Sequence, residues 1–114
     1  MSTFAVEGGA KLKGSIAVSG NKNEALPAIA AALLCEKKVT LANMPDIGDI
    51  HNMLGVAEAL GATVSGLKNG TVTVSAERIS DSTLPLPLSR AIRASIVFAS
   101  ALLVRTGKAV VPQP

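Results

Sequence analysis

The strongest constraint on this fold is a contrast between helix-forming segments that lack a polar face and strands that alternate. One helix is predicted from about Glu24 to Cys35, and its only charge is at its start. Another is predicted from Ser89 to about Val104, with arginines only at its ends. Helices that are apolar on every side belong in a protein interior. The sequence therefore predicts that both helices are covered by other elements.

The predicted strands have the opposite character. Thr71 to Ser75 alternates polar and apolar residues, which is typical of a sheet with one face in water. The Asn69-Gly70 dipeptide before it predicts a tight hairpin. Strands are predicted over residues 3–7, 15–18, 38–42, 62–65, 71–75 and 108–111, with a third helix over 49–60. This order favours an α/β fold with helices inside and sheets outside, and it argues against a doubly wound fold.

Composition narrows the class of protein. A chain of 114 residues with 48% hydrophobic residues, two Phe and no Trp or Tyr predicts one domain with an aliphatic core. The net charge of +3 includes no basic run of the kind that marks nucleic-acid binding. Cys35 is the single cysteine, and we expect a buried, inert thiol and a cytoplasmic location. No apolar stretch approaches the length of a membrane span.

The start of the first helix is a candidate anion site. Lys22 lies between Asn21 and Asn23 there, beside backbone N–H groups and the positive end of the helix dipole. A phosphate or carboxylate could bind at this point. The alternative is that the asparagines only cap the helix and that Lys22 points into solvent.

A second candidate is the pair Arg90 and Arg93, three residues apart at the start of the helix predicted over 89–104. Cations in a first turn oppose the helix dipole, which a bound anion would offset. A neighbouring carboxylate such as Asp81 would serve equally well. The spacing leaves both alternatives open.

Other reactive residues indicate no complete catalytic site. His51 has no partner at ligand spacing, so we expect no metal site. Asp46 and Asp49 are expected to initiate the helix over 49–60, because acidic residues are favoured in a first turn. No nucleotide-binding fingerprint is present, and no cofactor is expected.

The segment Val18 to Pro27, together with Ala31 to Leu34, resembles the opening signature of the UDP-N-acetylglucosamine enolpyruvyl transferases. Leu60 to Ala62, Arg93 to Ser95 and Val110 to Pro112 extend the similarity over nearly the whole chain. The sister enzymes that make 5-enolpyruvylshikimate 3-phosphate share the fold but usually have Lys-Ser in place of Lys22-Asn23. They are the second alternative.

The resemblance implies an inside-out α/β barrel, incomplete in this chain. It assigns residues 1–21 to strands of a second domain and residues 22–114 to the first part of a UDP-sugar-binding domain. Lys22 and Asn23 would contact phosphoenolpyruvate, and Arg93 would contact UDP-N-acetylglucosamine. The general acid, a cysteine or aspartate on a glycine-rich loop, would follow Pro114, so no catalytic residue is expected within the chain.

The resemblance also implies a reaction, transfer of the enolpyruvyl group to the sugar 3-hydroxyl with release of phosphate, in peptidoglycan precursor synthesis. We expect the segment alone to be inactive and prone to self-association through bare apolar surface. The rival from another class is a non-catalytic module that binds a nucleotide or RNA phosphate. Scarce aromatic residues and the absence of a GXXG loop disfavour RNA.

Overall fold

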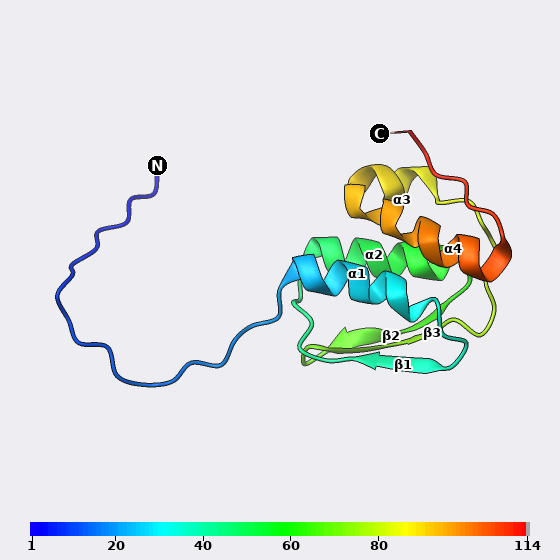
Figure 1. Ribbon diagram of the computed structural model, residues 1–114. Coiled ribbons are helices and arrows are strands. Elements are labelled where there is room, and N and C mark those ends of the chain that lie inside the picture. The colour runs from blue at the N-terminus through cyan, green and yellow to red at the C-terminus, as the bar shows by residue number, and fades with distance from the viewer. Residues whose placement is uncertain (114) are drawn as a thin grey trace.

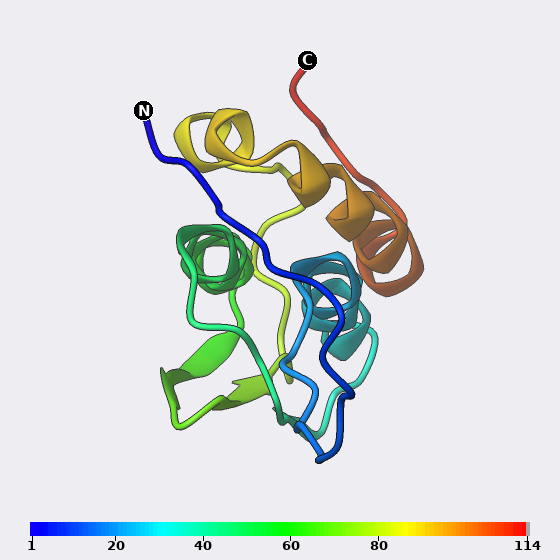
Figure 2. The same cartoon turned by 90° about the vertical axis from the view of Figure 1, so that its left-hand side faces the viewer.

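The computed structural model describes residues 1–113, and Pro114 lies outside the described residues. Its elements form three layers (Figures 1 and 2). A sheet forms the first layer, two helices the second, and two helices joined by a 3₁₀ turn the third. The sheet holds β1 (Lys38–Leu41), β2 (Thr63–Lys68) and β3 (Thr71–Ser75); the middle layer holds α1 (Lys22–Ala32) and α2 (Gly48–Ala59); the outer layer holds α3 (Leu86–Ala91), η1 (Arg93–Val97) and α4 (Phe98–Thr106).

The sheet confirms the predicted alternation. Its order is β1-β3-β2, with both pairs antiparallel. Val72 and Val74 of β3 are buried against the helices, while the hydroxyls of Thr40 and Thr73 lie 3.5 Å apart on the outer face. The turn at Asn69 and Gly70 has positive φ at both residues, as the predicted tight hairpin requires. One face of the sheet therefore meets water.

Helix α1 forms as predicted and packs against other elements, although one side that includes Pro27 and Ala31 is exposed. It lies between the sheet and α4, with α2 beside it (Figure 2). Ile29 and Leu33 have no exposed surface. The helix ends at Ala32, earlier than predicted, because the chain turns there toward β1. Cys35 lies in that turn and is exposed, so the prediction of a buried thiol was wrong.

The helix predicted over residues 89–104 is broken into three pieces. Pro85 is the N-cap of α3 and Pro87 lies in its first turn, where proline is tolerated, so the helix begins before Ser89, which is not its cap. Ile92 then adopts an extended conformation, with φ −141° and ψ 112°. The break leaves both Ile92 and Phe98 in the core. The outer face of this layer is open, with Leu103 53% exposed, so the prediction that this segment is covered on every side was wrong.

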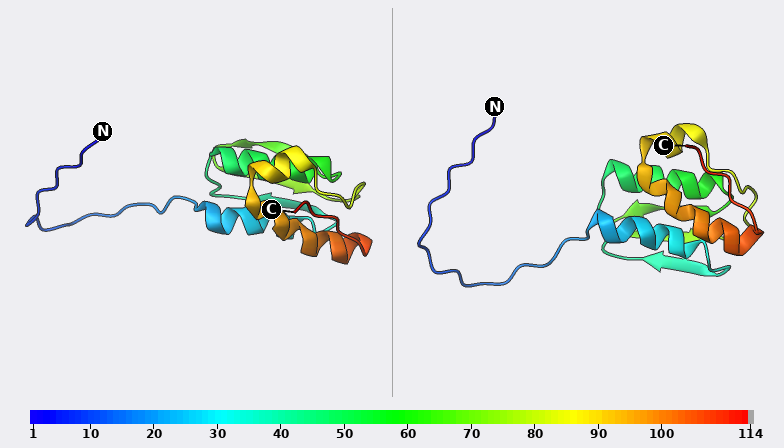
Figure 3. Two further views of the ribbon diagram at one scale, coloured as in Figure 1. Left: turned by 90° about the horizontal axis from the view of Figure 1, so that it is seen from above. Right: turned by 45° about the horizontal axis from the view of Figure 1, so that its top comes forward.

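The strands predicted at residues 3–7 and 15–18 are not formed. Residues 1–21 have no regular structure, and the chain before Val18 extends away from the body (Figure 3). The Cα radius of gyration is 17.4 Å, against about 13 Å for a compact chain of this size. A two-stranded hairpin with nothing packed on it is marginal in water, which explains its absence here. The strand predicted at residues 108–111 is reduced to one parallel bridge between Thr83 and Val110.

The mixed helix and strand class is confirmed. Residues 1–113 contain one three-stranded sheet with helices against one face, and a closed barrel is not seen in them. Three short strands are too few to close on themselves. Within the same residues, no helix has the length and apolar character required to cross a bilayer.

Candidate functional site

The amino end of α1 is built by a close backbone contact. Gly20 lies against the turn at Asn43, where an added Cβ would be 1.7 Å from the Asn43 carbonyl oxygen. Only glycine fits there without a shift of the chain. The next residue, Asn21, caps the helix, because its Oδ1 accepts the backbone N–H of Asn23 at 2.7 Å, as a capping side chain does. The predicted cap is confirmed.

Lys22 does not point freely into solvent, because its side chain forms an ion pair. Its Nζ lies 2.9 Å from Oδ2 of Asp49, in the first turn of α2. The two side chains are 50% and 37% exposed, respectively. Helices α1 and α2 begin at the same end of the molecule, where the ion pair connects them (Figure 1). Asn23 is exposed beside it.

A cavity of about 410 Å³ lies next to this helix end. The incoming chain, the first turns of α1 and the turn after β1 line it; the lining includes Gly20, Asn21, Glu24 and Asn43. Lys22 and Asn23 are not among its lining residues. The polar groups at this cavity are therefore the cap and its neighbours, and the predicted phosphoenolpyruvate contacts lie outside it.

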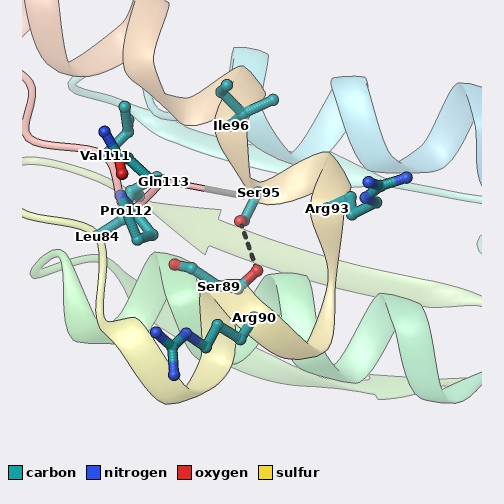
Figure 4. Close-up of a pocket in the computed structure, with 9 residues that line it drawn as sticks. All are labelled: Leu84, Ser89, Arg90, Arg93, Ser95, Ile96, Val111, Pro112 and Gln113. Atoms are coloured by element: carbon teal, nitrogen blue, oxygen red, sulfur yellow. Dashed lines mark hydrogen bonds between the residues drawn. The ribbon is translucent and has the colours of Figure 1, made fainter.

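The arginine pair belongs to a second cavity, of about 370 Å³, in the outer layer. Arg90 lies in the last turn of α3 and Arg93 opens η1, so the prediction that they share one face of one helix was wrong. The extended residue Ile92 between them redirects the chain, and their side chains point away from each other in Figure 4. Val111 and Pro112 close the opposite side of the cavity.

A buried hydroxyl also lines this second cavity. Ser89 is 7% exposed, and its Oγ has no hydrogen-bond partner among the described residues. Its carbonyl oxygen accepts a 3.4 Å hydrogen bond from the hydroxyl of Ser95 (Figure 4). Within residues 1–113, neither arginine forms an ion pair with a carboxylate. Asp81, the predicted alternative partner, instead accepts the backbone N–H of Thr83 at 2.9 Å.

The acidic residues around the start of α2 have separate roles. Asp49 lies in the first turn, as predicted, whereas Asp46 precedes the helix and contacts Nε2 of His51 at 2.5 Å. His51 is exposed on the surface. Within the described part of the chain, no cluster of three His, Cys, Asp or Glu residues could hold a metal ion.

Arg105 has a structural role that its sequence position did not predict. Its guanidinium donates to the carbonyl oxygens of Leu33 at 2.6 Å and Ala76 at 2.8 Å, which joins α4 to the end of α1 and the end of β3. A basic residue in the last turn of a helix is an ordinary signal for capping its own helix. No sequence pattern indicated that Arg105 would cap a different one.

Comparisons with known proteins identify the family. The family model described as EPSP synthase (3-phosphoshikimate 1-carboxyvinyltransferase) matches residues 6–112. The chain belongs to this enolpyruvyl transferase family. Its curated relatives include the UDP-N-acetylglucosamine 1-carboxyvinyltransferase of Treponema denticola, which is 46% identical over 114 residues. The enzyme of the same name from Bradyrhizobium diazoefficiens is 44% identical over 111 residues.

The same family appears among solved structures. The enolpyruvyl transferase NikO from Streptomyces tendae superposes with a TM-score of 0.72 at 31% identity, over 88% of this chain and 23% of that one. The two curated relatives are matched over 100% and 97% of this chain, but over only 27% and 26% of their own lengths. The chain thus spans about a quarter of the length of the enolpyruvyl transferases that it matches.

Proposed function

We propose that this chain is a segment of an enzyme that transfers the enolpyruvyl group of phosphoenolpyruvate to the 3-hydroxyl of UDP-N-acetylglucosamine. Phosphate is released, and the product is a precursor of peptidoglycan. The observation that carries the proposal is the match of the whole chain to enzymes of that name, at up to 46% identity in the relatives described above. The lysine-asparagine pair at positions 22 and 23 supports this substrate over shikimate 3-phosphate.

In this proposal Lys22 and Asn23 bind phosphoenolpyruvate. The support is their place at the amino end of α1, where free backbone N–H groups and the helix dipole favour an anion. Half of the Lys22 side chain is exposed, which leaves room for a phosphate to approach it. These groups stabilise charge and hold the reactant in position, so that its enol carbon can bond to the sugar hydroxyl oxygen.

Arg93 binds UDP-N-acetylglucosamine in the same proposal. Its support is an exposed guanidinium at the cavity of the outer layer, without a carboxylate partner in residues 1–113. A guanidinium can donate two parallel hydrogen bonds to one phosphate. The general acid would come from a segment other than these residues, and the 114 residues alone would not turn over.

The larger architecture is part of the proposal. Residues 1–21 would pair with strands of a second domain, and residues 22–114 would form one unit of an inside-out barrel. The exposed apolar residues of the tail, including Phe4 at 94% and Ile16 at 92%, support a missing partner surface. A cytoplasmic location and self-association of the isolated segment stay predictions.

A chimeric enzyme tests the function. The matched segment of the Treponema denticola relative is replaced by this chain, and phosphate release is measured with phosphoenolpyruvate and UDP-N-acetylglucosamine. We expect turnover with the UDP-sugar and none with shikimate 3-phosphate, while the 114-residue chain alone releases no phosphate. A well-folded chimera that uses shikimate 3-phosphate would favour the sister activity. Turnover by the isolated chain would refute its assignment as an incomplete segment.

A further inference from the structure

The ion pair between Lys22 and Asp49 is an interaction that the proposed function does not explain. It joins residues 27 positions apart in the sequence, at the adjacent amino ends of α1 and α2. The Nζ to Oδ2 distance of 2.9 Å is that of a direct hydrogen bond between charged groups. The pair therefore favours one position for the far end of a long, half-exposed side chain.

The helix dipole stabilises the charge of Asp49 at the start of α2 and disfavours the charge of Lys22 at the start of α1. A carboxylate in a first turn is stabilised by the helix dipole, and Asp49 has that position in α2. An ammonium at the first residue of a helix is disfavoured, and Lys22 has that position in α1. Asp49 therefore provides the negative charge that keeps the Lys22 ammonium beside α1 rather than in bulk solvent.

The ammonium keeps binding capacity in this arrangement. Lysine carries three N–H donors, and the contact with Asp49 uses one of them. Half of the Lys22 side chain remains exposed, so a ligand can reach it without breaking the pair. The neighbouring Asn23 side chain is exposed at the same helix end.

We propose that Asp49 is a positioning residue, which holds the Lys22 ammonium where an anionic group of phosphoenolpyruvate binds. This inference rests on the proposed function, because that function supplies the ligand. Asp49 acts through Lys22 and does not itself touch the substrate. An ordinary surface ion pair would have no such consequence for ligand preference.

The first test measures the pair itself in the 114-residue chain. Each lysine is labelled briefly with an amine-reactive acyl ester, and the Lys22 rate is compared by mass spectrometry with the exposed Lys37 and Lys38. The ammonium must leave Asp49 before the amine reacts. We expect Asp49→Asn to raise the relative Lys22 rate about 1.5- to 5-fold, the range for an exposed ion pair. An unchanged rate would overturn the inference.

A matched control lies three residues earlier. Asp46 is also exposed and also forms a pair, but with His51. Asp46→Asn should leave the Lys22 rate unchanged, and Asp49→Glu should restore part of the slow rate. Circular dichroism checks that each variant keeps its helices, so that a rise in labelling reports the pair and not unfolding.

The second test separates positioning from simple pairing. Labelling is repeated with phosphoenolpyruvate and with inorganic phosphate at equal concentration. In the unmodified chain, phosphoenolpyruvate should protect Lys22 more than phosphate does, and Asp49→Asn should abolish that preference. If phosphoenolpyruvate still protects Lys22 more than phosphate does in Asp49→Asn, the positioning role of Asp49 is refuted, but the proposed function is not. An unmodified chain without any preference contradicts the phosphoenolpyruvate assignment in the proposed function, and with it the substrate role of Asp49.

Discussion

Helix α1 and the segment from α3 to α4 have similarly apolar sequences, but they differ in helix continuity and in burial. Asn21 caps α1, which runs as one helix through the middle layer with Ile29 fully buried. In the other segment, the first helix begins at Leu86, before the predicted start at Ser89, and the helical structure is interrupted at Ile92. Leu103 in this segment is exposed. Apolar composition therefore predicts that a helix forms, whereas the elements around it decide how much of it is covered.

The largest expected effect comes from the covered helix. Ile29→Ala removes a side chain with no exposed surface and leaves a cavity between the sheet and the outer layer. We expect a loss of about 2–5 kcal/mol in the free energy of unfolding, measured by urea denaturation. A loss below about 1 kcal/mol would mean that α1 is not the centre of the core.

The connection between the two regions gives the next effect. Arg105→Met keeps an unbranched apolar stem but removes the guanidinium that donates to the carbonyl oxygens of Leu33 and Ala76. Hydrogen bonds from a charged donor contribute about 1.5–3 kcal/mol, and solvent at this half-buried site reduces that figure. We expect a loss of about 1–2 kcal/mol by the same assay. Equal stability of Arg105→Met and the unmodified chain would show that α4 does not depend on this contact.

The helix cap has a smaller expected effect. Asn21→Ala removes the acceptor for the backbone N–H of Asn23. Loss of such a cap should cost about 1 kcal/mol, again measured by urea denaturation. Asn23→Ala is the matched control, because no hydrogen bond of its own side chain is found in residues 1–113. If the two variants were equally stable, the cap would not explain why α1 starts where it does.

The smallest effect is expected on the open face. Leu103→Ala changes a side chain that is 53% exposed. Surface substitutions of this kind usually change stability by less than about 0.5 kcal/mol. Urea denaturation of a dilute sample checks this value. A loss close to that of Ile29→Ala would show that another surface covers Leu103, as it would in a self-associated chain.

The sequence predicted most of the regular structure. Local signals sufficed for the cap at Asn21, the hairpin turn at Asn69 and Gly70, and the alternation of β3. Sequence-based prediction failed where contacts with distant segments determine the backbone conformation. The extended backbone of Ile92 depends on where its side chain and that of Phe98 meet the core, which no local pattern reveals. The strands predicted at residues 3–7 and 15–18 likewise did not form, because none of the described elements pairs with them.

The candidate site was predicted only as separate residues. The sequence placed Lys22 at a helix end and Arg93 near the start of another, because both signals are local. It did not predict the ion pair with Asp49, since this depends on the adjacent starts of α1 and α2. The structure places Arg93 at a cavity whose lining does not include Lys22. The joint site for two substrates stays a proposal.

The most direct test of the account is the substrate dependence of two variants of the chimeric enzyme. Lys22→Met should raise KM for phosphoenolpyruvate about tenfold or more, and Arg93→Met should do the same for UDP-N-acetylglucosamine, because each loses a charge-assisted hydrogen bond. Each variant should leave KM for the other substrate nearly unchanged. If both variants kept the KM values of the unmodified chimera, these residues would not bind the substrates, and the account of the site would be wrong.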